Sequence, residues 1–251
     1  VDNDATFTGA VTANTAFTVA TAGTDVTLSA ASSLGTLTAT TGTLTANGLI
    51  TTVNTVNTAG KIYLNVAENE MGAGKYTAGD GAELHVGKAF VTTENIFLSD
   101  VSAGEGDFHT GSKIYLPSNL TSGETLKITD AGAFDQGDAS KTAITTAARI
   151  DATLQDTALV NYSASAASAG ATVITITATD KTASAIATEL KTTDNNATAA
   201  LQLMSALDAN DTSGDTAAYD AFDNALKAQS GLSVNEDTAF INQVSPQTDL
   251  I

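Results

Sequence analysis

Apolar and polar residues alternate along the first fifty residues, in short stretches that turn signals separate. The alternation is clear at residues 5–11, 16–19, 25–28 and 42–45. A period of two places every second side chain on the same face of a β-strand. The turn signals recur about every 9 or 10 residues, and they are Asn14, Gly23, Ser32-Ser33, Gly42 and Asn47-Gly48. Strands of this length and spacing are typical of a β-sandwich, a barrel or a solenoid.

A second, fainter pattern follows between residues 61 and 133. Residues 61–64, 95–98 and 113–116 share one arrangement of polar, aliphatic and aromatic side chains, and each is followed by a glycine, namely Gly72, Gly104 and Gly123. Stacked coils of a β-helix produce such a repeat, because each coil places the same side chains in the same layer. The intervals, 34 and 18 residues (61 to 95 and 95 to 113), are unequal. This inequality slightly favours the simpler explanation that aliphatic and aromatic residues populate ordinary strands.

Beyond residue 180 the apolar spacing becomes helical. One helix is expected over residues 183–190, with Asp180 as its N-cap, and a second over 197–207. A third is expected over 219–226, with Gly231 placed to end it.

The predicted fold class is therefore mainly β, either a β-solenoid (β-helix) or a β-sandwich, with a smaller C-terminal α-helical region. We predict a β-rich domain over residues 1–179, with a sub-boundary near 50–60. A helical C-terminal region over residues 180–251 completes the predicted organisation.

The composition excludes several classes of protein. Threonine accounts for roughly one residue in six and aromatic residues for only 5%, which predicts strands around a thin core. The net charge of −18 and 10 basic residues exclude binding to nucleic acid or anionic lipid, which requires clustered Lys and Arg. The absence of cysteine excludes a disulfide scaffold and a thiolate metal site. No apolar run approaches the length of a membrane span, and the acidic start, residues 1–4, favours a mature, exported chain.

The sequence contains no recognisable catalytic motif. Residues 71–77 are glycine-rich but lack the first glycine of a phosphate-binding loop, and Tyr76 stands where that loop has Ser or Thr. The two histidines, His85 and His109, are isolated, and no serine lies in a nucleophile-elbow motif. We therefore predict that the chain is not an enzyme, with a secreted hydrolase as the least favoured alternative.

Acidic loops offer the only candidate metal ligands. Short clusters of carboxylates occur beside glycine or other small residues, at Asp107, Asp135, Asp138 and Asp211. None matches the calcium-loop consensus, so solvated acidic loops are favoured over calcium sites. Calcium, if it binds, is expected to stabilise the protein and to take no part in catalysis.

The C-terminal region contains an Ala- and Asn-rich stretch at residues 194–201, a small-residue helix at 216–226 and a segment, 242–246, that ends in Val-Ser-Pro. These residues resemble the segment that joins passenger to membrane barrel in bacterial autotransporters, with Val244 in place of the family's leucine and Gln247 in place of the acid that often follows. The resemblance implies a passenger that is exported through the outer membrane of a Gram-negative bacterium, commonly a right-handed β-helix. Because no barrel strands follow, the chain would be a processed passenger. Surface-layer proteins and filament subunits share its acidic, threonine-rich character.

These observations favour an extracellular or cell-surface structural protein that self-assembles into a fibre or layer. The alternative is a secreted adhesin that recognises a glycan or host protein through exposed aromatics, for which the candidates are Tyr63, Tyr76, Phe108 and Tyr115. The terminal stretch 4–20 also has clean alternation. In a self-assembling protein it could leave its own sheet and complete that of a neighbour, although pairing within its own domain is the ordinary outcome.

Overall fold

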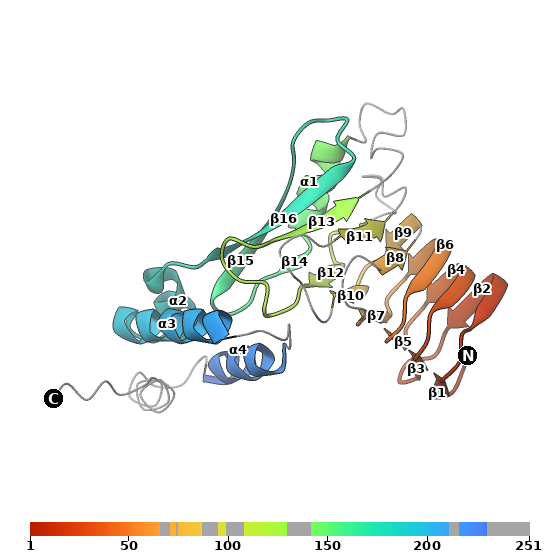
Figure 1. The fold of residues 1–251 in the computed structure, drawn as a ribbon, viewed down its shortest axis with the longest axis horizontal. Coiled ribbons are helices and arrows are strands. Elements are labelled where there is room, and N and C mark those ends of the chain that lie inside the picture. The colour runs from red at the N-terminus through yellow and green to blue at the C-terminus, as the bar shows by residue number, and fades with distance from the viewer. Residues whose placement is uncertain are drawn as a thin grey trace. The chain divides into compact units, whose positions relative to one another are not determined.

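The computed structural model describes residues 1–65, 71–73, 75–86, 95–98, 108–129, 142–210 and 216–229 (Figure 1). The chain divides into two compact units that interleave along the sequence. The first comprises Val1–Pro117, Thr125–Gln155 and Tyr162–Thr177, and the second comprises Ser118–Glu124, Asp156–Asn161 and Ala178–Ile251. The division into separate domains at residue 180 stays a prediction.

The first unit contains a seven-stranded sheet in which every neighbouring pair is parallel. Its strands, in spatial order, are β1 (Ala5–Phe7), β3 (Asp25–Leu28), β5 (Thr43–Ala46), β7 (Lys61–Leu64), β10 (Glu83–Val86), β12 (Lys113–Tyr115) and β14 (Leu154–Gln155). Between β1 and β7 the strands of this sheet alternate along the chain with strands of a second sheet, which is the pattern of a chain that winds in coils.

The second sheet is also parallel, and its four strands are β2 (Thr12–Val19), β4 (Ser32–Ala39), β6 (Ile50–Asn57) and β9 (Lys75–Ala78). In the first coils β1, β3 and β5 are each followed by a strand of the second sheet, and successive coils stack in order (Figure 1). After β7, β10, β12 and β14 the next strand belongs to a third sheet. The N-terminal part is a β-solenoid of about four turns. Of the predicted alternatives, the solenoid is confirmed.

The register of the coils explains the alternation in the sequence. Val26 pairs with Leu44 and Leu44 with Ile62, so an 18-residue period brings apolar side chains into one column. All three are buried, with at most 2% of their surface exposed. Threonines between them face outward and are half-buried, as at Thr27 and Thr45. The period-two pattern therefore fills the solenoid with a thin column of aliphatic side chains.

Two of the predicted turns lie inside strands. Ser32 begins β4, where its hydroxyl donates to the carbonyl of Ala30 and accepts from the Val11 amide. These bonds allow a buried serine to serve as a strand residue. Asn14 lies within β2, next to a shift in the register between Ala13 and Ala16.

The terminal stretch 4–20 pairs within its own solenoid. β1 pairs with β3, and β2 pairs with β4. Phe17 and Val19 of β2 are buried in the core. This is the ordinary arrangement, and exchange of the stretch with a neighbouring copy stays a hypothesis.

A third, five-stranded sheet contains the only antiparallel pair for which the structure gives a register. Its order is β15 (Val160–Ala166), β16 (Val173–Asp180), β13 (Thr125–Thr129), β11 (Asn95–Leu98) and β8 (Met71–Ala73), with β13 antiparallel to β16. The helix α1 (Ala143–Asp151) follows β13 along the chain and was not predicted from the sequence. It begins with a capping box between Thr142 and Thr145.

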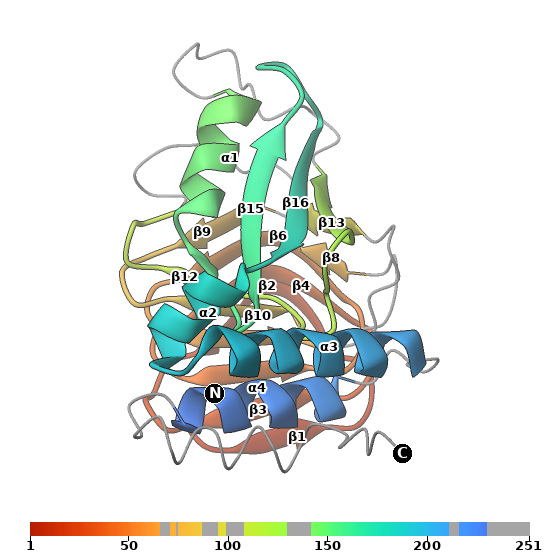
Figure 2. The same cartoon turned by 90° about the vertical axis from the view of Figure 1, so that its left-hand side faces the viewer.

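The second unit holds the three predicted C-terminal helices, α2 (Ala183–Leu190), α3 (Asp194–Asn210) and α4 (Ala217–Gln229). In Figure 2, α3 and α4 run beside each other. The predicted N-cap was wrong: the hydroxyl of Thr182, and not the carboxylate of Asp180, accepts from the Ala185 amide. Asp180 is the last residue of β16. The expected stop at Gly231 lies outside the described residues.

Candidate functional site

Three aromatic side chains form a column on the outer face of the first sheet. Tyr63, His85 and Tyr115 occupy equivalent register positions in β7, β10 and β12. The His85 ring centroid lies 4.1 Å from that of Tyr63 and 4.3 Å from that of Tyr115, with interplanar angles of 16° and 4°. Parallel strands lie about 4.8 Å apart, so the spacing of the coils sets this face-to-face stacking.

A charged row lies beside the column, two residues earlier in each strand. Lys61, Glu83 and Lys113 are aligned in register. One oxygen of Glu83, Oε2, lies 3.2 Å from Lys61 Nζ and 2.8 Å from His85 Nε2. Glu83 and His85 are each 20% exposed, whereas Lys61 is 49% exposed. A single carboxylate oxygen therefore serves both the lysine and the histidine.

The contacts of Glu83 determine the ionisation of the cluster. Burial lowers the pKa of the His85 imidazole, and the hydrogen bond to Glu83 offsets only part of this effect. Burial acts to raise the pKa of Glu83, but hydrogen bonds from His85 and Lys61, together with the lysine charge, outweigh it and leave the pKa lowered. The hydrogen bond and charge of Glu83 raise the pKa of Lys61. At neutral pH the cluster of Lys61, Glu83 and His85 thus contains a cation, an anion and a neutral imidazole that donates from Nε2.

The other two predicted binding aromatics lie in the core. Tyr76 is 2% exposed and Phe108 is completely buried, and their ring centroids are 5.6 Å apart. The Tyr76 hydroxyl accepts from the Asn57 side-chain amide at 3.3 Å, and burial raises its pKa. These two rings contribute to packing, so the predicted aromatic surface is reduced to Tyr63 and Tyr115.

The second histidine has an exposed neighbour. His109 Nδ1 lies 3.6 Å from a carboxylate oxygen of Asp80, and the two side chains are 47% and 79% exposed. The same nitrogen accepts from the Gly111 amide. The pair is therefore open to water, which weakens any electrostatic effect of one group on the other.

The glycine-rich stretch 71–77 falls in two strands. Met71–Ala73 is β8 and Lys75–Ala78 is β9, and the next described element is the strand β10. A phosphate-binding loop must lead into a helix. The structure therefore agrees with the exclusion of such a loop.

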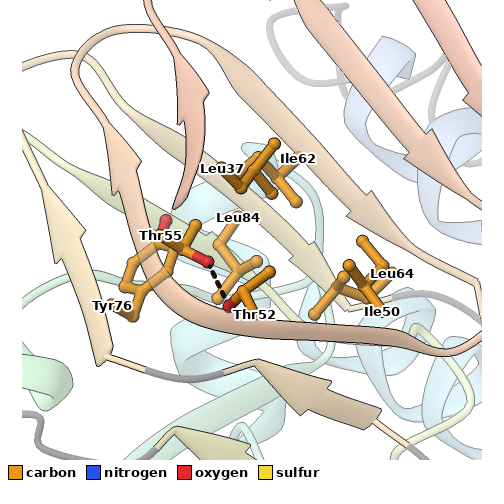
Figure 3. A pocket seen from close by; sticks show the side chains of 8 residues that line it. All are labelled: Leu37, Ile50, Thr52, Thr55, Ile62, Leu64, Tyr76 and Leu84. Carbon is orange, nitrogen blue, oxygen red and sulfur yellow. Dashed lines mark hydrogen bonds between the residues drawn. The ribbon is translucent and has the colours of Figure 1, made fainter. Parts of the chain in front are cut away.

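A small cavity lies inside the solenoid (Figure 3). Its volume is about 10 Å³, and it is lined by Leu37, Ile50, Thr52, Thr55, Ile62, Leu64, Tyr76 and Leu84. The hydroxyls of Thr52 and Thr55 bond to each other at 2.9 Å. A single water needs roughly 10–15 Å³, so this space holds no organic ligand.

The four predicted calcium ligands, Asp107, Asp135, Asp138 and Asp211, lie outside the described residues. Within the described ranges, no three His, Cys, Asp or Glu side chains gather into a metal-binding group. Of the helices in those ranges, none combines the length and apolar character needed to span a bilayer.

The sequence analysis missed the centre of the column. His85 was treated as isolated, and Lys61 and Glu83 were not singled out. The segments 61–64, 83–86 and 113–116 repeat one order, namely charged, aliphatic, aromatic and aliphatic. That order was the sequence signal that could have placed His85 between Tyr63 and Tyr115. The segment 95–98, which the sequence pattern grouped with 61–64 and 113–116, belongs to the third sheet.

Comparison with protein-family models, with curated proteins and with solved structures found no match to this chain. The described residues show a mainly β fold with an N-terminal solenoid, a small antiparallel pairing and four helices in the C-terminal part.

Proposed function

We propose that this chain is a non-enzymatic extracellular structural protein that self-assembles into a cell-surface fibre or layer. The observation that carries the proposal is the edge of the first coil. In the described part of the chain, β1 pairs only with β3 and β2 only with β4. The other edge of β1 offers backbone donors and acceptors to a further coil. On β2 the open edge is partly occupied, because the amino group of Val1 donates to the Thr18 carbonyl.

The geometry of the coils supports head-to-tail addition. Stacking a coil from one copy on the first coil of another would continue the same parallel ladders. A head-to-tail contact that does not close on itself generates an open filament. The backbone hydrogen bonds would supply affinity, and the alternating side chains would fix the register.

The aromatic column also fits a structural role. Its tyrosine rings cover both faces of the His85 ring, so the column joins β7, β10 and β12. Stacked aromatic neighbours of this kind stabilise adjacent strands. The proposed location at the cell surface rests on the resemblance to autotransporter passengers and on the character shared with surface-layer proteins. The residues of this chain that carry the autotransporter resemblance lie partly in α3 and α4.

An edge-specific variant tests the proposal. The Ser29 amide donates to the Phe7 carbonyl at 2.9 Å, so the backbone of Phe7 faces β3 and that of its neighbour Thr6 faces the open edge. Thr6→Pro removes a donor from the open edge alone, which an edge strand tolerates. We expect Thr6→Pro to fold, by circular dichroism, and to lose assembly in electron micrographs. The Thr6→Ala control should assemble, and a Thr6→Pro variant that assembles like the parent chain would contradict the proposal.

An adhesin is the second candidate, favoured by the half-buried column and the charged row beside it. Tyrosine hydroxyls, Glu83 and Lys113 could bond to the hydroxyls of a glycan that lies along the solenoid. Binding to an immobilised glycan panel should then be lost in Tyr63→Ala and kept in Tyr76→Phe, whose ring stays in the core. Equal binding by both variants, or no binding by the parent chain, would remove this candidate.

A further inference from the structure

His85 is held in the centre of the column by contacts from its own strand, β10, and from the two neighbouring strands, β7 and β12. Its ring is stacked on both faces, and its Nε2 is bonded to Glu83. The titratable and charged groups that face it are Lys61 and Tyr63 from β7, Glu83 from β10, and Lys113 and Tyr115 from β12. Gln155 of β14, the next register position after Tyr115, is neutral.

Protonation of His85 would place a positive charge in an unfavourable environment. Among the described residues, Glu83 is the only carboxylate within hydrogen-bond reach of His85, and the same oxygen already pairs with Lys61. The tyrosine ring faces attract a cation. Two effects disfavour the protonated imidazole of His85. Its side chain is only 20% exposed and so has lost most of its water, and the charge of Lys61 repels it.

From this geometry we propose that His85 makes the middle of the solenoid acid-sensitive: protonation of its ring loosens the coils that β7, β10 and β12 join. The inference concerns cohesion within one copy, and it holds whether or not copies assemble. Because the imidazole is part of the stack itself, its charge acts directly at the contacts between successive coils.

The sign of the pH effect follows from the direction of the pKa shift. The folded-state pKa of His85 lies below its ordinary value of 6.5. The unfolded chain therefore binds the proton more readily. The stabilisation is complete above about pH 6.5 and is lost as the pH falls through the folded-state pKa.

Histidine NMR on the full chain tests the electrostatic part. There are two histidines, so His109→Gln leaves one titrating signal. Its midpoint should lie below 6.5, should rise in Lys61→Met, and should fall further in Glu83→Gln. Lys113→Met is the matched control, with a smaller shift, because no ion pair joins Lys113 to the cluster within the described residues. A titration midpoint of His85 at or above 6.5, or a midpoint that does not change in Lys61→Met, would overturn the inference.

Hydrogen exchange tests the structural part. Between about pH 7.5 and 5.5, and after correction for intrinsic exchange rates, amides of β7, β10 and β12 should lose up to about tenfold in protection. Amides of β3 and β5 should change less. His85→Phe keeps a stacked ring without a titrating group, so this local difference should disappear. If that variant does not fold, the comparison of β7, β10 and β12 with β3 and β5 in the parent chain still decides. A change in protection that is equal in all five strands, or no change between the two pH values, would refute the proposal.

Discussion

Gly48 lies between β5 and β6, where the chain passes close to the preceding coil. A Cβ atom at this position would lie 2.3 Å from the carbonyl carbon of Ala30 and 2.6 Å from the Ala31 nitrogen. Both are backbone atoms, which cannot move aside like the end of a flexible side chain. The pair Asn47-Gly48 predicts a turn from the sequence, but the reason for the glycine lies in the stacking of the coils.

Gly48→Ala should therefore lower the free energy of unfolding by about 1–3 kcal/mol, the usual cost of overpacking. Gly9→Ala is the matched control, because a Cβ there would meet no atom within 4 Å. Urea unfolding of the two variants measures the difference. Equal stability of both would mean that the coil contact at Gly48 does not constrain the chain.

The residues of the aromatic column show how far the sequence could predict the site. Tyr63 and Tyr115 stand out as candidates because aromatic residues in predicted strands are few in this chain, and their use as a binding surface stays a prediction. Tyr76 could not be distinguished from them, since alternation does not tell which face points inward. His85 was missed because insertions of different length separate the coils and hide the common register.

At the scale of elements, local signals predicted the strands of the early coils and the three C-terminal helices. The strand pattern is strong there, because an 18-residue period repeats without insertion. Helix α1 was missed, since Thr142, Thr145 and Thr146 are β-branched residues that favour strands. Its capping box and the buried residues of one face, including Ala147 and Ile150, favour the helix. Tertiary packing thus outweighs propensity in this segment.

Helix α2 provides a prediction at this scale. Thr182→Ala removes the acceptor for the Ala185 amide and should reduce stability by about 0.5–2 kcal/mol. Thr182→Ser should restore most of the loss, and Ser184→Ala, at an exposed position in the first turn, should have little effect. Thermal unfolding followed by circular dichroism measures all three variants. A loss with Ser184→Ala as large as with Thr182→Ala would contradict the assignment of the cap.

For the whole molecule, the charge of −18 opposes assembly, because copies repel one another at low ionic strength. Calcium bound at carboxylates such as those of Asp107, Asp135, Asp138 or Asp211 would reduce this repulsion. If calcium binds at these residues, a chelator should lower the melting temperature and reduce assembly. Magnesium at equal concentration controls for general screening, and unchanged melting and assembly after chelation would reject the calcium prediction.

The central claim is that this solenoid is a self-assembling structural subunit. Negative-stain electron microscopy of the purified chain, with light scattering on the same sample, tests it most directly. With and without calcium, across a series of protein concentrations, we predict fibres or ordered layers whose fraction grows with concentration. A monodisperse monomer at the highest concentration, under both conditions, would contradict the claim.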